Sequence, residues 1–130
     1  MTEELLLQDL KQTYVRLLPS GTHGIGVFAI RFIPKGCRNM FTMDRGEWMK
    51  IDMKEVSLLP SYSRQLITNY CAFDDQHYYI EKTGFKKMDL VNFINHSNKP
   101  NIGTLESGKY FEAITDIKAG QELFIDYRNL

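Results

Sequence analysis

The chain has 130 residues, with 16 basic and 16 acidic side chains and a formal net charge of zero. A chain of this length forms one domain whose core needs no disulfide or structural metal. The charge balance argues against nucleic acid as the main partner, and no apolar run approaches the roughly 20 residues of a membrane span. The first residues lack the basic region of a signal peptide, and Cys37 and Cys71 lack metal-binding spacing. We therefore expect a soluble intracellular protein, in the nucleus or the cytoplasm, with no direct nucleic-acid binding and no membrane attachment.

The N-terminal part of the chain is predicted to be an arm followed by two strands. Leucines among acidic and polar residues predict a short amphipathic helix or an ordered arm over residues 3–12, so the main domain is expected to span residues 14–130, after an arm of residues 1–13. Strands are expected over residues 14–18 and 27–30, with turn-forming residues at 19–21 between them and a further turn at 34–36.

Residues 37–70 are the least regular part of the chain and are expected to form an insert. Within it, residues 48–51 predict a strand, and residues 58–67 predict a short helix that begins near Pro60 or Ser61. Trp48, the single tryptophan, is expected to lie in the core. Another short strand is predicted at residues 78–80.

The C-terminal part is predicted to be almost entirely strand and turn. Residues 101–106 and 109–114 are expected to pair as a hairpin around Ser107 and Gly108, and residues 116–121 to form a turn. A final strand is predicted over residues 122–127. Many short strands and little helix predict a mainly β fold.

Between these strands, residues 91–101 (VNFINHSNKPN) change abruptly from apolar to polar. The apolar part is either a short strand or the end of a helix. Asn95, His96 and Ser97 follow it directly, at the edge of the expected core, where polar groups must be paired. They are paired either with each other, in a self-contained turn, or with a bound ligand. A nucleophilic Ser-His pair is not expected, because neighbours in sequence rarely reach the required geometry.

Gly24 and Gly26 precede a predicted strand with one residue between them. The pattern is not a dinucleotide-binding fingerprint, because the third glycine is missing and no helix follows. Two interpretations stay open: a hairpin turn that needs a positive φ, or bare backbone that a flat ligand can approach.

Three segments stand in a fixed order along the chain: HGIGVFA at residues 23–29 with IPKG at 33–36, FINHSNKPN at 93–101, and IKAGQELFIDY at 117–127. In this order and spacing the chain resembles the SET-domain protein lysine methyltransferases, from about residue 15 to residue 127. The resemblance implies a mainly β, β-clip-like fold of small curved sheets with a knot-like C-terminal segment and few short helices. It also implies methyl transfer from S-adenosylmethionine to a lysine side chain of a protein substrate, with histones among the candidates.

Carried over position by position, the resemblance implies a cofactor site and a lysine channel. The backbone at Gly24, Ile25 and Gly26 would contact S-adenosylmethionine, and Asn95 and His96 would hold its methionine and adenine parts. Tyr127 would be the catalytic tyrosine at the end of the lysine channel. Its role, as a positioning group or as a general base, is left open.

Other positions in the matching segments are assigned to the core, the channel or structural contacts. Ile125 would line the channel, where its modest size is expected to allow more than one methyl group on the lysine. Phe93 and Ile94 are expected in the core. Glu122 and Asp126 are expected to be structural, although either would also suit a basic substrate.

The chain departs from the family pattern in two places. Asn98 stands where many members have a zinc-binding cysteine, and only three residues follow Tyr127, so no metal is expected. Closure of the site is then expected from the N-terminal arm, the 37–70 insert, the substrate or a second subunit, with the arm or a homodimer favoured. A second channel tyrosine has no clear counterpart: Thr42 or Asp44 falls there by count, with the substitutes Tyr70, Tyr78 and Tyr79 unranked. The alternative function is a catalytically inactive SET-like module that binds a peptide or partner.

Overall fold

The structure, a computed structural model, describes residues 2–41, 47–106, 108 and 110–129. The contacts divide the chain into two units. The first unit combines Met1–Met43 with Phe93–Leu130, and the second unit is Asp44–Asn92. None of the helices formed by the described residues has the length and apolar character needed to cross a membrane.

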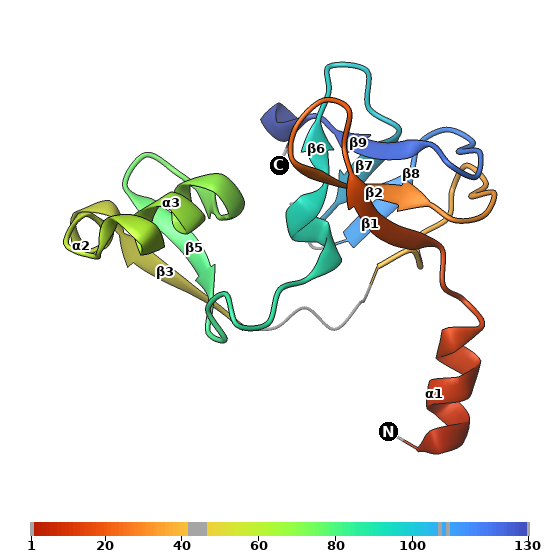
Figure 1. The fold of residues 1–130 in the computed structure, drawn as a ribbon, viewed down its shortest axis with the longest axis horizontal. Helices are drawn as coiled ribbons and strands as arrows, with labels where there is room; N and C mark the ends of the chain where they lie inside the picture. Colours follow the sequence, from red (N-terminus) through yellow and green to blue (C-terminus); the bar gives the residue numbers. More distant parts are fainter. Residues whose placement is uncertain (1, 42–46, 107, 109, 130) are drawn as a thin grey trace. The chain divides into compact units, whose positions relative to one another are not determined.

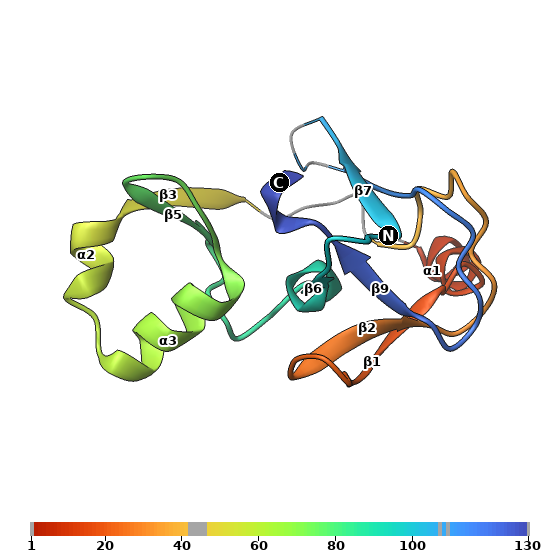
Figure 2. The ribbon, with the colours of Figure 1, turned by 90° about the horizontal axis from the view of Figure 1, so that it is seen from above.

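The first unit is built on one sheet whose strands come from both ends of the chain (Figures 1 and 2). In spatial order it contains β1 (Val15–Pro19), β2 (Ile25–Ala29), β9 (Glu122–Ile125), β7 (Ile102–Leu105) and β8 (Tyr110–Ala113), with β6 (Asn95–His96) also paired to β9. The β1–β2, β2–β9 and β7–β8 pairs are antiparallel, whereas β6 and β7 run parallel to β9. The mainly β fold with few short helices is confirmed.

Strand β9 lies between β2 and β7 in the sheet, and its alternate residues face the core. Leu123 and Ile125 are 0% and 3% exposed, whereas Glu122 before them and Phe124 between them are only half-buried. This period of two places the apolar pair on one face of the sheet. The largest fully buried side chains, which form the centre of the core, are Val27, Ile33, Ile102, Ile117 and Leu123. An isolated antiparallel bridge between residues 33 and 117 extends this core beyond the named strands.

Asn101 connects the polar segment after β6 to β9. Its backbone N–H donates to the Phe124 carbonyl at 3.2 Å. Its side chain accepts from the Phe124 N–H at 2.8 Å and donates to the Glu122 carbonyl at 2.9 Å. A side chain that imitates a strand neighbour in this way satisfies backbone groups where regular pairing stops.

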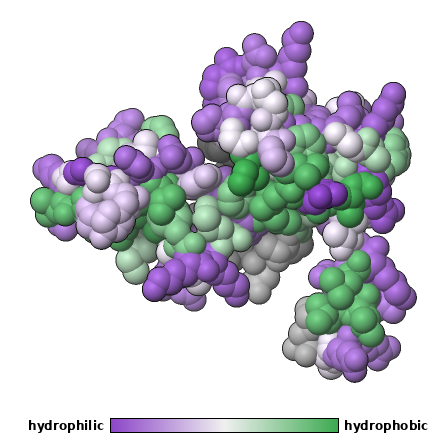
Figure 3. Space-filling view, viewed as in Figure 1, coloured by the Kyte–Doolittle hydropathy of each residue, from purple (hydrophilic) through white to green (hydrophobic). Residues whose placement is uncertain are grey.

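Helix α1 (Glu3–Leu10) is capped by the Thr2 hydroxyl, which accepts from the Leu5 N–H at 3.1 Å. Two glutamates in its first turn stabilise the helix, because their negative charges lie at the positive end of the helix dipole. No residue of this helix is buried. Figure 3 shows hydrophobic atoms gathered on α1, and its exposed large hydrophobic residues are Leu5, Leu6, Leu7 and Leu10.

The second unit is a small sheet with two short helices. Strands β3 (Trp48–Asp52), β5 (His77–Glu81) and β4 (Ala72–Phe73) form the sheet in that order, with β5 in the middle. Helix α2 (Met53–Ser57) follows β3, with the Asp52 carboxylate accepting from the Lys54 N–H at 2.8 Å. Helix α3 (Ser61–Tyr70) begins after Pro60, as predicted. Val56 and Ile67 are buried within this unit.

Three local predictions differ from the structure. Trp48 is 39% exposed instead of lying in the core, because it is the first residue of β3. The last strand ends at Ile125, and Tyr127 begins a 3₁₀ helix, Tyr127–Asn129. The second unit reaches Asn92 because β5 belongs to the same sheet as β3, whereas the insert was expected over residues 37–70. Residues 42–46 of that insert, and Ser107 of the predicted hairpin turn, lie outside the described residues.

Candidate functional site

The predicted site residues lie on three segments of the first unit: the β1–β2 loop, strand β6, and the end of β9 with the 3₁₀ helix after it. Hydrogen bonds join these segments in two groups. Asn95 of β6 is hydrogen bonded to the β1–β2 loop, and His96 of β6 is hydrogen bonded to Tyr127. The structure therefore brings the predicted cofactor residues and the predicted catalytic tyrosine to the same strand, β6.

Gly24 turns the β1–β2 hairpin. Its φ is +49°, in the left-handed region that favours glycine, and its carbonyl accepts from the Ser20 N–H at 2.7 Å. No atom lies within 4 Å of the position that a Cβ would occupy. Gly24 and Ile25 are exposed. The turn interpretation is thus correct for Gly24, and its open backbone face is also accessible to a ligand.

Gly26 is buried, and a glycine is needed at this position for a different reason than at Gly24. Its φ is not in the left-handed region, but a Cβ there would overlap the Glu122 carboxylate, with the carboxyl carbon 2.8 Å away. The Asn95 amide nitrogen would be 3.2 Å away. The absence of a side chain at residue 26 therefore makes room for two side chains of the protein itself.

The Asn95 carboxamide ties β6 to the β1–β2 loop and to β9. Its Nδ2 donates to the His23 carbonyl at 3.0 Å, the Ile25 carbonyl at 3.3 Å and the Glu122 carboxylate at 2.8 Å. Asn95 is a buried polar residue, and buried polar groups need such partners. All the hydrogen bonds that its side chain makes to described residues come from Nδ2, and none of them involves the Oδ1 atom.

Glu122 and Ser20 complete this network, and sequence reasoning gave Ser20 no role in the site. The Ser20 hydroxyl donates to the second Glu122 oxygen at 2.7 Å and accepts from the Thr22 N–H at 3.1 Å. Ser20 and Glu122 are 102 residues apart. The only local signal is a serine in a turn, which is too common to identify such a contact. Glu122 is structural, as expected.

Tyr127 lies against His96 with its hydroxyl turned toward the backbone. The hydroxyl donates to the Ile94 carbonyl at 2.6 Å, and the ring centroids of Tyr127 and His96 are 5.2 Å apart. Half of the residue is exposed, and partial burial raises the pKa of Tyr127 above its usual value. The phenol is therefore protonated at neutral pH.

The hydrogen bonds of His96 define its tautomer. The Tyr127 backbone N–H donates to His96 Nδ1 at 3.0 Å, so this nitrogen carries a lone pair and the ring hydrogen is on Nε2. The Asp126 carboxylate lies 3.8 Å from the same nitrogen.

Asp126 anchors the segment that carries Tyr127. One carboxylate oxygen accepts from the Arg128 backbone N–H at 3.0 Å and from its Nε at 2.9 Å, and the other accepts from Nη2 at 2.5 Å. These bonds to the arginine lower the pKa of the buried Asp126 carboxyl to about 2. Asp126 is thus paired within the protein.

The predicted channel residues are less clearly placed. Ile125 is buried in the core on β9, so its role in a channel, and the methylation state inferred from it, stay predictions. Thr42 and Asp44 lie outside the described residues. Tyr70, Tyr78 and Tyr79 belong to the second unit, where the Tyr79 hydroxyl donates to Asp74 at 2.6 Å.

Comparisons with known proteins agree with this arrangement. The crystal structure of a Plasmodium falciparum protein, described as a candidate histone methyltransferase, is similar to this chain with a TM-score of 0.54. The two are 18% identical, and the match covers 89% of this chain and 94% of the other, so the likeness concerns the fold. A search of curated proteins finds no significant match. The SET domain family model matches residues 24–128, which include the β1–β2 turn, β6, β9 and Tyr127, and the chain therefore belongs to the SET-domain family.

Proposed function

We propose that this domain transfers a methyl group from S-adenosylmethionine to a lysine side chain of a protein. Members of the SET-domain family are generally protein lysine methyltransferases, which supports the proposal at the family level. The observation that carries it for this chain is the joint anchoring at β6, where Asn95 holds the β1–β2 loop and His96 and Ile94 hold Tyr127.

The residues near Asn95 fit the proposed cofactor. Gly24 presents bare backbone with open space beside it, as a flat ligand requires. The Asn95 Oδ1 atom is an acceptor suited to the cofactor's ammonium group, since Nδ2 is occupied by the protein. His96 has a donor at Nε2. Gly26 serves this site indirectly, by leaving space for Asn95 and Glu122.

When bound, the cofactor supplies a methyl group on a positively charged sulfur, and no metal or covalent intermediate is required. The task of the protein is to bring the lysine nitrogen into line with that methyl group, which is chiefly an effect of proximity and orientation. The Tyr127 hydroxyl gives its hydrogen to the Ile94 carbonyl, so its oxygen lone pairs face outward as acceptors. They can orient the hydrogens of the incoming lysine nitrogen.

Tyr127 is proposed to position the substrate and not to act as a general base. A tyrosine must lose its own proton before it can act as a general base, and burial raises the pKa of this phenol above its ordinary value. Lysine itself has a pKa of about 10.4 in water, so it must lose a proton before attack. Removal of water from around the ammonium favours that loss by disfavouring the charged form.

The substrate is proposed to be a protein, with histones as the first class to examine. The Plasmodium falciparum protein of similar fold is described as a candidate histone methyltransferase, and this supports the choice of substrate pool. The formal net charge of zero gives no general attraction to basic tails, so a second, unbiased pool is needed.

The test supplies tritiated-methyl S-adenosylmethionine with core histones and, separately, with a cell extract. The wild-type protein should label lysine in one of the pools. Tyr127→Phe should bind the cofactor normally but lower the turnover rate at least about tenfold, the size of one lost hydrogen bond. Asn95→Ala should weaken cofactor binding, measured by calorimetry. Tyr62→Phe, at an exposed tyrosine of the second unit, is the matched control and should change nothing.

Two results would contradict the proposal in different ways. No cofactor binding by calorimetry would remove the methyl-transfer function. Cofactor binding without labelling of either pool would favour the inactive peptide-binding module instead. Full activity of Tyr127→Phe would leave the function intact and remove the role assigned to the hydroxyl.

A further inference from the structure

The Glu122 carboxylate joins two groups that hold the β1–β2 loop. One of its oxygens accepts from the Ser20 hydroxyl at 2.7 Å, and the other accepts from Asn95 Nδ2 at 2.8 Å. Glu122 is the first residue of β9, Ser20 directly follows β1, and Asn95 is the first residue of β6. One carboxylate therefore connects segments from three separate parts of the sequence.

Ser20 closes the loop to which this carboxylate is bonded. Its backbone N–H donates to the Gly24 carbonyl at 2.7 Å, and its hydroxyl oxygen accepts from the Thr22 N–H at 3.1 Å. A serine that bonds to backbone groups on both sides of a turn fixes the shape of that turn. The hydroxyl hydrogen that remains is given to Glu122, so the ordered loop is attached to the start of β9.

The Asn95 carboxamide is oriented by three acceptors. Its Nδ2 atom has two hydrogens and faces the His23 carbonyl, the Ile25 carbonyl and the Glu122 carboxylate, and the contact with Glu122 is the shortest. In the reversed orientation Oδ1 would face three other oxygens, which is unfavourable. Because the two arms of a carboxamide point in different directions, fixing Nδ2 also fixes the direction of Oδ1.

Gly26 limits the space in which these groups can move. A Cβ at this residue would be 2.8 Å from the carboxyl carbon of Glu122 and 3.2 Å from Asn95 Nδ2, so both groups lie against bare backbone. The backbone on one side and the Ser20 hydroxyl on the other hold the carboxylate in place. Glu122 is thus a fixed acceptor for Asn95.

We propose that Glu122, held by Ser20, is a positioning residue for the cofactor, because it fixes the Asn95 carboxamide in the orientation that presents Oδ1 to the cofactor's ammonium group. Glu122 itself acts only through Asn95. The inference rests on the cofactor binding in the proposed function, but it does not require methyl transfer. A carboxylate with a purely structural role would change stability, whereas a positioning carboxylate also changes cofactor affinity, and does so only while Asn95 is present.

The test is a titration of the ¹⁵N-labelled full chain with S-adenosylmethionine, followed by NMR, which also measures weak binding. Glu122→Gln keeps the size of the side chain, but one of its two arms is a donor, so it no longer accepts from both Ser20 and Asn95. We expect its dissociation constant to be about tenfold weaker than that of the wild type. Ser20→Ala keeps the carboxylate and removes one of its anchors, so it should weaken binding by a smaller factor.

A double-mutant cycle separates positioning from a general effect on the fold. In the Asn95→Ala background, Glu122→Gln should change the dissociation constant by less than about twofold, because the group through which Glu122 acts is gone. A second readout needs no cofactor. The side-chain amide signals of Asn95, identified by their loss in Asn95→Ala, should move in Glu122→Gln.

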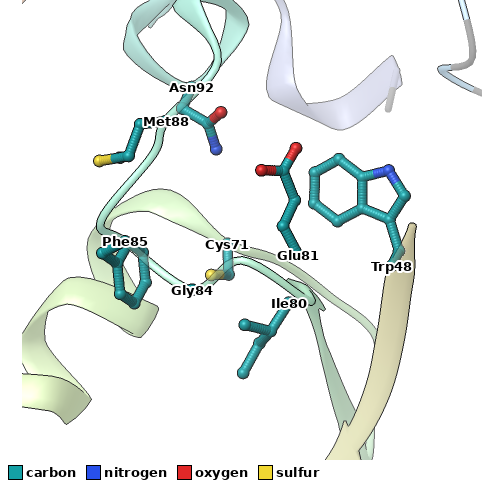
Figure 4. A pocket seen from close by; sticks show the side chains of 8 residues that line it. All are labelled: Trp48, Cys71, Ile80, Glu81, Gly84, Phe85, Met88 and Asn92. Atoms are coloured by element: carbon teal, nitrogen blue, oxygen red, sulfur yellow. The ribbon is translucent and has the colours of Figure 1, made fainter. Parts of the chain in front are cut away.

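Two matched variants control for the loss of a negative charge. Glu112→Gln changes another half-buried carboxylate of the first unit, which pairs with Arg38 at 3.0 Å. Glu81→Gln changes a half-buried carboxylate of the second unit, where Glu81 lines a small crevice beside Trp48 (Figure 4). Both variants should leave the cofactor affinity and the Asn95 signals unchanged, since the residues proposed to contact the cofactor lie elsewhere in the first unit.

The outcomes distinguish this inference from the proposed function. Wild-type affinity in Glu122→Gln or in Ser20→Ala, an equal loss of affinity with and without the Asn95 side chain, or an equal loss in the control variants would each overturn the positioning role and leave the proposed function intact. Failure of the wild type to bind S-adenosylmethionine would overturn both. The backbone amide signals show whether each variant is folded.

Discussion

Gly26 contributes to the site because it has no side chain. The residues alone leave open a turn or a point where a ligand approaches the backbone, and the family resemblance implies contact with the cofactor at this glycine. The structure gives it an internal function, because the Glu122 carboxylate and the Asn95 amide occupy the space next to its Cα. Those two groups meet at 2.8 Å and together hold the β1–β2 loop.

Replacing Gly26 with alanine should therefore destabilise the protein. The added Cβ would lie 2.8 Å from the Glu122 carboxyl carbon, so the carboxylate or the strand must move. We expect the free energy of unfolding, measured by urea denaturation, to fall by about 1–3 kcal/mol, the usual cost of overpacking.

Gly21→Ala is the matched control for that substitution. No atom lies within 4 Å of its Cβ position, and its φ is outside the left-handed region. This variant should keep or slightly raise the stability, because alanine restricts the unfolded chain. Equal effects of the two substitutions would show that the Glu122 carboxylate yields at no cost.

The strands of the first unit could be predicted from the sequence because they are short apolar runs bounded by turn-forming residues. Residues 123–125 are such a run, and the structure buries Leu123 and Ile125 on one face of β9. Helix α2 and the two-residue strand β4 were missed, because elements of five and two residues are too short to show a period. The predicted last strand reaches Tyr127, whereas β9 ends at Ile125 and Tyr127 begins a 3₁₀ helix.

The contacts that build the site could not be predicted at the element scale. The Asn95 side chain is hydrogen bonded to residues that lie 72 and 70 positions earlier in the sequence and 27 positions later. Such contacts depend on which strands become neighbours. Only the resemblance to a known family placed Gly24, Asn95 and Tyr127 together, and their individual roles remain proposals.

The end of β9 should respond to acid through Asp126. Hydrogen bonds to Arg128 lower the pKa of this carboxyl from 3.8 to about 2. A depressed pKa contributes stability at pH values above the ordinary one, and this contribution is lost as the carboxyl becomes protonated. Stability should thus fall between about pH 4 and pH 2.

The measurement is the urea midpoint as a function of pH for the wild type and Asp126→Asn. The asparagine variant should be less stable at neutral pH and should show a flatter decline between pH 4 and pH 2. Asp116→Asn is the control, since that exposed carboxylate accepts from the Lys35 N–H at the turn. Parallel pH curves for wild type and Asp126→Asn would refute the assignment.

At the scale of the whole molecule, the two units differ in the size of their cores. In the described part of the second unit the buried hydrophobic residues are Val56 and Ile67, whereas the first unit contains the fully buried residues around β2, β7 and β9. Buried apolar area is the main source of stability, so the two units are not expected to be equally stable.

Native-state hydrogen exchange should reveal this difference. Amides of β3 and β5 should exchange through an opening of lower free energy than amides of β2 and β9, because fewer apolar groups hold the second unit closed. Ile67→Val should lower the opening free energy of the second unit alone, by about 0.5–1.5 kcal/mol. Ile102→Val, at a fully buried position of the first unit, is the matched variant and should act on β2 and β9. If both variants shifted all protected amides equally, the chain would open as one cooperative body, and the difference expected between the two units would be wrong.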